Sequence, residues 1–152
     1  MNWIKSLWFK LLWFKNNKPE HGEAGQEAGS VILELAKSPM SSDVERLFLQ
    51  ALADDPIAIF KLALRVYKGF GVEQDYLLAY QIFKLLWSED ADAEFYMGEI
   101  CREVLVNGEA DYHQACCHYA AASEMGNPQA KMRLRETAEL TGDKFWLEWS
   151  GD

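Results

Sequence analysis

The side chains best suited to chemistry lie in one short run, His113-Gln114-Ala115-Cys116-Cys117-His118. His113 and Cys117 are four residues apart, so on a helix they share a face and offer two zinc ligands. No second pair follows at a zinc-finger spacing, and Cys101 would have to complete the site through the fold. We therefore favour a helix with buried cysteines and a histidine in an aromatic slot, and we predict no metal and no cofactor.

Signatures of other chemistry are missing from the sequence. It has no Gly-x-Ser-x-Gly elbow, no phosphate-binding glycine loop with lysine and no His-Glu-x-x-His pair. Asp90, Asp92 and Glu94 are spaced as in a calcium loop, but Phe95 stands where such a loop needs glycine. We expect that segment to be a solvated helix start, and we predict that the protein is not an enzyme.

Composition narrows the classes of partner. The chain has 152 residues, 49% of them hydrophobic, a net charge of -9 and a pI near 4.8. Such a surface repels a phosphate backbone, so nucleic acid is disfavoured as a partner. Three cysteines, two of them adjacent, do not form the pattern of a disulfide framework. A reducing compartment, most simply the cytoplasm, is predicted.

The first fifteen residues repeat a five-residue pattern with tryptophan first and lysine third. They carry +3, which leaves -12 for the remainder. Lysines interrupt every apolar run, which disfavours a signal peptide, and fifteen helical residues reach only about 22 Å, too short to span a bilayer. Either this segment lies at the inner face of an anionic membrane, or its aromatics pack on the body or on a second copy. The membrane-interface candidates are Trp3, Lys5, Trp8, Lys10, Trp13 and Lys15.

A repeat begins after a linker at residues 16–29, which is rich in glycine and polar side chains. Ala58, Ala93 and Ala130 open three similar stretches, at intervals of 35 and 37 residues. The apolar spacing predicts helices at 2–15, 28–37, 42–53, 56–68, 75–88, 91–105, 111–125 and 128–140.

Other residue types have predicted local roles. The small residues expected where helices touch are Ala63, Ala79, Gly98, Ala115 and Ala122. Gly69 and Gly71 are expected in a turn, and Asp75 and Asp111 as helix N-caps. Pro56 and Pro128 are expected in the first turn of a helix.

These motifs resemble the Sel-one-like repeat, a relative of the tetratricopeptide repeat, over about residues 43–140. The run Ala63/Gly69-Phe70-Gly71-Val72/Asp75/Ala79 is the most specific part. The family's usual tyrosine and tryptophan positions hold other residues here, namely Val66, Cys101, Ile82 and His118. The resemblance implies an all-α fold, an α-solenoid of about three antiparallel helix pairs preceded by the N-terminal aromatic and basic helix.

The resemblance also implies that the first helix of each pair lines a concave groove. Counted from the small-residue positions, the partner-binding candidates are Phe60, Leu64, Tyr67, Phe95, Glu99, Arg102, Met132, Glu136 and Glu139. This groove is predicted to be aromatic at one end and acidic at the other. The alternative is that Phe60, Leu64 and Phe95 belong to the core.

The sequence thus predicts an N-terminal helix at 1–15, a linker at 16–29, a helical repeat domain at 30–142 and a C-terminal tail or cap at 143–152. Its predicted function is to bind another protein, as an adaptor or scaffold of bacterial type. The alternative is an immunity protein that neutralises a secreted antibacterial toxin, because an acidic body complements a basic enzyme. Neither function requires a small-molecule substrate.

Overall fold

The computed structural model describes residues 29–86, 89–103 and 110–151, and this part of the chain is all-α. Helical residues 29–33 continue into a short 3-10 helix, and the α-helices follow in order. The elements are η1 (Glu34–Lys37), α3 (Ser42–Leu52), α4 (Pro56–Lys68), α5 (Tyr76–Lys84), α6 (Ala91–Glu103), α7 (Tyr112–Glu124), α8 (Ala130–Thr141) and α9 (Lys144–Trp149). The described residues contain no strand, only an isolated bridge between Met40 and Val72.

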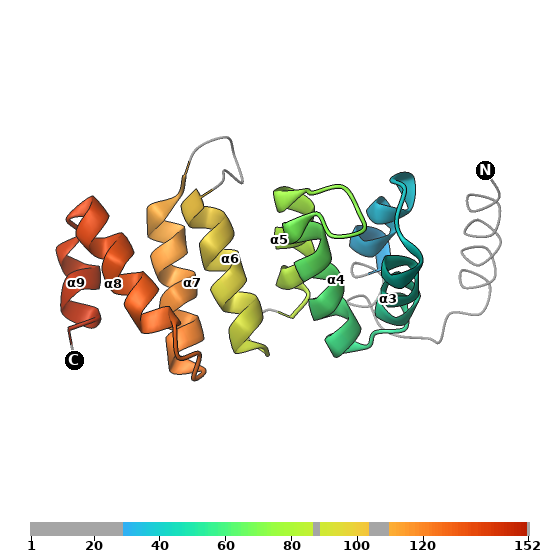
Figure 1. Cartoon of the computed structure of the whole chain (residues 1–152). Helices are drawn as coiled ribbons and strands as arrows, with labels where there is room; N and C mark the ends of the chain where they lie inside the picture. Colours follow the sequence, from blue (N-terminus) through green and yellow to red (C-terminus); the bar gives the residue numbers. More distant parts are fainter. Residues whose placement is uncertain (1–28, 87–88, 104–109, 152) are drawn as a thin grey trace.

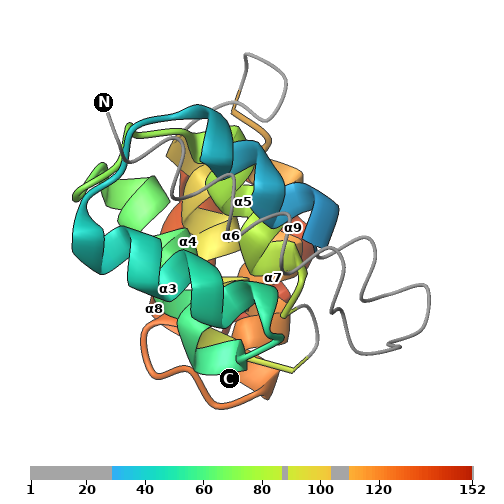
Figure 2. The ribbon, with the colours of Figure 1, turned by 90° about the vertical axis from the view of Figure 1, so that its right-hand side faces the viewer.

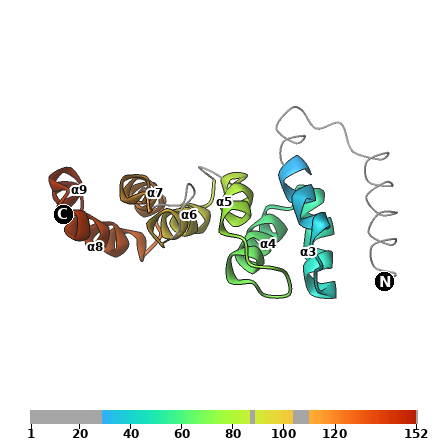
Figure 3. The same cartoon turned by 90° about the horizontal axis from the view of Figure 1, so that it is seen from above.

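The helices form an elongated row in chain order, with α3 at one end and α9 at the other (Figure 1). Each α-helix from α3 to α8 packs against the next one in the sequence. Seen from above, α4, α6 and α8 lie in one layer and α5, α7 and α9 in the other (Figure 3). Figure 2 looks along the row from the α3 end, with the two layers behind α3. Residues of α4, α6 and α8 therefore share one long face, here called the α4–α6–α8 face.

Side-chain caps determine where the helices begin. Asp75 accepts a hydrogen bond from the backbone N–H of Leu78 at 2.9 Å, and Asp111 accepts one from Gln114 at 2.9 Å, so both predicted N-caps are confirmed. Pro56 is the first residue of α4, as predicted. Helix α8 instead begins at Ala130, two residues after Pro128, because the Asn127 side chain forms a turn by accepting from two backbone N–H groups.

Glycines reverse the chain between α4 and α5. Gly69 and Gly71 have φ of 71° and 77°, the left-handed conformation that side chains disfavour. At Gly71 an added Cβ would also lie against the Ser41 hydroxyl. Both predicted turn glycines are confirmed by these angles.

Small residues bring neighbouring helices close together. All five predicted positions are buried. A Cβ added to Gly98 in α6 would lie 2.7 Å from Cε1 of Tyr119 in α7, a distance that heavy atoms do not tolerate. The tyrosine ring therefore fills the space that a side chain at position 98 would need.

One predicted boundary is wrong, and the predicted C-terminal tail contains a helix. Helix α5 ends at Lys84 rather than at residue 88, because turns follow at Leu85 and Leu86. The tail predicted after residue 142 contains a helix, α9, whose N-cap Asp143 accepts from the N–H groups of Phe145 and Trp146. Trp146 is buried against the preceding helices, whereas Phe145 is exposed. The predicted helix at 2–15 and nearly all of the predicted linker lie outside the described residues.

Candidate functional site

The predicted binding residues of α4 are half-buried, and their ring contacts run to α5 and α6. The Phe60 ring contacts Phe83 of α5 and Tyr96 of α6, with centroid distances of 5.6 and 6.1 Å. Tyr67 contacts Tyr76 and Tyr96, at 5.6 and 5.5 Å. Leu64 packs at the edge of the same core. Because Phe60, Leu64 and Tyr67 are four and three residues apart, one face of α4 presents all three.

In α6 the aromatic residue of this face is Tyr96, which was not among the predicted residues. Tyr96 contacts both Phe60 and Tyr67, so its ring bridges α4 and α6. The predicted Phe95 is 8% exposed and packs toward α7, with its ring 5.8 Å from that of Tyr119. Consecutive helical residues point about 100° apart, so an error of one position is enough to exchange the two. We call Phe60, Tyr67, Tyr76 and Tyr96 the aromatic cluster.

The other end of the α4–α6–α8 face carries ion pairs. Glu99 of α6 accepts a hydrogen bond from the Tyr119 hydroxyl at 2.6 Å and pairs with Arg133 of α8 at 3.1 Å. Glu136 pairs with Arg133 at 3.1 Å and with Arg102 at 3.8 Å. The face was predicted to be acidic here, but two arginines balance these two carboxylates.

The remaining candidates of α8 are exposed. Met132 is 56% exposed, and Glu139 pairs with Arg135 within the same helix at 3.1 Å. Glu99, by contrast, is 7% exposed, so its carboxylate is enclosed by partners of its own chain. The structure thus brings together Glu99, Arg102 and Glu136, and separately Phe60, Leu64 and Tyr67.

Negative charge lies beside the aromatic cluster. Burial, followed by the charges of Glu103 and Glu99, raises the pKa of Tyr67 to about 12. Burial, with Asp92 and Glu99, also raises the pKa of Tyr96. Glu103 is exposed and makes no hydrogen bond or ion pair with another described residue. One end of the face therefore combines aromatic rings with an exposed carboxylate that no other described residue neutralises.

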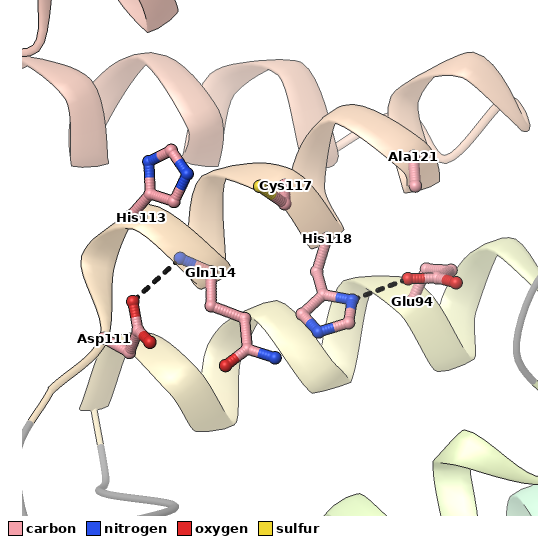
Figure 4. A pocket seen from close by; sticks show the side chains of 7 residues that line it. All are labelled: Glu94, Asp111, His113, Gln114, Cys117, His118 and Ala121. Carbon is pink, nitrogen blue, oxygen red and sulfur yellow. Dashed lines mark hydrogen bonds and ion pairs between the residues drawn. The ribbon is translucent and has the colours of Figure 1, made fainter.

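A pocket of about 570 Å³ opens beside α6 and α7 (Figure 4). It is lined by Glu94, Asp111, His113, Gln114, Cys117, His118 and Ala121. His118 Nδ1 lies 2.8 Å from a Glu94 carboxylate oxygen, and Nε2 lies 3.1 Å from the Tyr80 hydroxyl of α5. The side-chain amide of Gln114 donates to the same hydroxyl at 3.1 Å. With Nδ1–H donating to Glu94, Nε2 accepts from Tyr80, and every group in this chain of bonds is satisfied.

Two groups at this pocket have raised pKa values: Tyr80, which is bonded to the lining residue His118, and the lining residue Cys117. Burial, then Cys101, Glu94 and Asp111, raises the pKa of Tyr80 to about 12. Burial and Asp111 raise the pKa of the Cys117 thiol, although a backbone hydrogen bond opposes them. Neither group is a phenolate or thiolate nucleophile at neutral pH. The hydrogen bonds of His118 to Tyr80 and Glu94 connect α7 to α5 and α6.

The residues first considered as zinc ligands do not converge. No group of three histidine, cysteine or acidic side chains in the described ranges could hold a metal ion. His113 accepts a hydrogen bond from the Trp146 indole at 3.5 Å, while Cys101 is buried and Cys117 exposed. His118 lies buried and edge-on to Tyr80, the aromatic slot that was predicted. Glu94 was expected to be solvated but is 1% exposed, and no sequence signal distinguished it from Asp92.

Comparisons with known proteins found no matching family model, no matching curated protein and no matching solved structure. The membrane-interface candidates, from Trp3 to Lys15, lie outside the described residues. In the part of the chain that is described, no helix has the length and apolar character to cross a bilayer.

Proposed function

We propose that this chain is a non-enzymatic protein-interaction module, an α-solenoid of antiparallel helix pairs of the Sel-one-like kind. The two layers and the neighbour-on-neighbour packing support the solenoid (Figure 3). In such arrays the first helices of the pairs present an extended binding surface. The α4–α6–α8 face is the corresponding surface here.

The aromatic cluster is the observation on which this proposal mainly rests. Its four rings come from three helices, contact one another and remain partly exposed, so they form a continuous aromatic surface that solvent reaches. Tyrosine is enriched among the residues that dominate binding energy, because it combines a large apolar ring with a hydroxyl that can hydrogen-bond. We infer that Phe60, Tyr67 and Tyr96 anchor the partner protein.

The second candidate function, inhibition of a basic antibacterial toxin, is favoured by charge. Residues 16–152 carry -12, and Glu103 adds negative charge beside the anchors. An inhibitor associates quickly through long-range attraction, so its association rate falls steeply with salt. An adaptor depends less on salt and more on its N-terminal segment, which we propose holds it at the cytoplasmic face of a membrane.

The test is affinity capture of the tagged full-length protein from its native cell, in wild-type form and as Tyr67→Ala. We expect Tyr67→Ala to weaken binding of the captured partner by about thirtyfold, a typical hot-spot effect. Tyr112→Ala is the matched control, because Tyr112 begins α7 in the other layer and lies outside the cluster. Equal losses for both variants, or none for either, would refute the α4–α6–α8 face as the binding surface.

Deleting residues 1–15 separates the two functions. For an adaptor, the shortened protein keeps its affinity for the partner but no longer sediments with anionic liposomes. For an inhibitor, the deletion leaves inhibition unchanged, and raising the salt concentration slows association. Genes neighbouring that of this protein supply an inexpensive companion observation, because immunity proteins are encoded beside their toxins.

A further inference from the structure

We propose that the aromatic cluster, together with Glu103, is a receptor for an arginine side chain of the partner protein. This inference rests on the proposed function and names the chemistry that the α4–α6–α8 face recognises. It begins from the arrangement of the rings. Tyr67 and Tyr96 meet edge-to-face with centroids 5.5 Å apart, and Tyr67 meets Tyr76 in the same way at 5.6 Å.

In an edge-to-face pair the edge of one ring covers one face of the other, and that contact leaves the remaining faces of the two rings uncovered. The face of a tyrosine ring is electron-rich, so it attracts a cation that approaches within about 6 Å of its centroid. One face of Tyr96 is covered by Phe83, which stacks on it with an interplanar angle of 6°. Part of this aromatic surface faces solvent, because Tyr67, Tyr76 and Tyr96 are each only partly buried.

The charge needed for ion pairing comes from the same helix. Tyr96, Glu99 and Glu103 are separated by three and four residues, so α6 presents them on one side. Glu99 is not available, because the Tyr119 hydroxyl and the Arg133 guanidinium already occupy its carboxylate. Glu103 has no partner among the other described residues, and after burial its charge is the main cause of the raised pKa of Tyr67.

This combination fits arginine better than lysine. A guanidinium is planar, so it can stack on a tyrosine ring while its N–H groups reach a carboxylate beside the ring. An ammonium group is a strongly hydrated point charge and cannot use both contacts in the same geometry. The same chain pairs Arg133 with Glu99, whose carboxylate also accepts from the Tyr119 hydroxyl.

The test uses full-length protein and three glycine-flanked, end-blocked peptides that differ at one position: arginine, lysine or citrulline. Citrulline keeps the planar shape of arginine without its charge. Binding is followed by amide chemical shifts in two-dimensional NMR spectra. We expect the arginine peptide to shift the signals of Tyr67, Tyr96 and Glu103 and to bind at least about threefold more tightly than either other peptide.

Two charge-matched variants separate a specific site from general attraction to an acidic protein. Glu103→Gln should weaken binding of the arginine peptide about fivefold, whereas Glu148→Gln, which removes the same charge at an exposed position of α9, should leave its affinity unchanged. Tyr67→Leu should weaken it by a similar factor. Equal binding by the citrulline or lysine peptide, or equal effects of the two glutamate variants, would overturn the arginine receptor.

The two proposals fail separately. If Tyr67→Ala still captures the partner fully, the binding face is wrong, whatever the peptides show. If Tyr67→Ala loses the partner while arginine and citrulline peptides bind alike, the face is retained and only the arginine receptor is refuted.

Discussion

The two ends of the helix row are stabilised by different kinds of side chain. Among the described residues before Asp90, every buried side chain is apolar, as at Phe48, Leu62 and Phe83. In α6, α7 and α8 the buried apolar residues are smaller, mostly alanine and cysteine, and charged or polar groups are buried with them. These groups are Glu94, Glu99, His118, Asn127 and Thr137, with Ser150 after α9.

The polar groups connect one helix to another. Glu94 and His118 connect α6 and α7, and Asn127 donates to Asp92 at 2.7 Å, which holds the turn before α8 against the start of α6. Within the described residues, no side-chain nitrogen or oxygen is buried without a hydrogen-bond partner. A fully satisfied network of this kind specifies one alignment of the helices, whereas apolar contacts tolerate several.

The difference implies two kinds of vulnerability. The α3–α5 end gains its stability from burial of large apolar side chains, which depends on volume and is insensitive to salt. The α6–α8 end depends on a few directional bonds between buried groups, and removing one member leaves its partner unsatisfied. The four predictions below separate these two ends.

The largest effect is expected for Glu99→Lys, about 4 kcal/mol of destabilisation. The variant leaves the Tyr119 hydroxyl without its acceptor and places a second cation beside Arg133, and breaking a buried pair is costly for that reason. The measurement is the free energy of unfolding in urea. Glu139→Lys, in an exposed pair with Arg135, should change it by about 0.5 kcal/mol or less. Similar values for the two variants would contradict the buried network.

At the apolar end, Leu62→Ala should cost about 3 kcal/mol, because Leu62 is fully buried and its loss leaves a cavity. Its cost should be the same in low and high salt, unlike a cost that arises from charge. Leu77→Ala is the control, since Leu77 is 47% exposed on α5. A strong salt dependence for Leu62→Ala would show that the two ends do not differ as described.

Gly98→Val should destabilise the protein by about 2 kcal/mol or more. The new side chain would meet the buried Tyr119 ring, whose hydroxyl is held by Glu99. Ala121→Val in α7 introduces the same β-branched side chain at a half-buried position, with two added carbons instead of three, and should cost less than about 1 kcal/mol. Melting temperatures measure both, and an unchanged value for Gly98→Val would show that α6 and α7 separate easily.

Local features of this fold could be predicted from sequence because single residue types determine them. Asp75 and Asp111 cap helices, Gly69 and Gly71 adopt positive φ, and Gly98 lies at a close contact; each depends on a local property. The all-α fold follows from the helical spacing of apolar residues, which extends over most of the described chain.

Pairing between helices could not be predicted in the same way. Glu99 was expected to line an open groove, yet Tyr119 and Arg133 enclose it from 20 and 34 residues away. Phe95 and Tyr96 are adjacent and both aromatic, and only the packing of α4 and α7 determines which of them faces which helix. Such partners depend on tertiary geometry, which a periodic pattern fixes only to within about one residue.

The smallest effect concerns thiol reactivity, which involves no change in stability. Cys101 and Cys116 are buried, and burial raises the pKa of their thiols to about 12 and about 11, so both stay protonated at pH 8. Cys117 is exposed, and we expect it alone to react quickly with a maleimide, as followed by peptide mass spectrometry. At pH 8 the folded protein keeps all the stability that these raised thiol pKa values contribute. Stability from a raised thiol pKa is fully present below about pH 9 and is lost as pH rises through 11 to 12.

Because both protected thiols belong to the α6–α8 end, their slow labelling measures how often that end opens. Val66→Cys places a matched thiol at a fully buried position of the apolar end with little change in volume. If the ends open separately, the thiols of Cys101 and Cys116 label at one rate and the introduced thiol at another. The stabilities of the two ends then differ by RT times the logarithm of that ratio, under conditions where opening and closing are fast. A common rate for all three thiols would show that the helix row opens only as a whole, so that its two kinds of core belong to one cooperative unit.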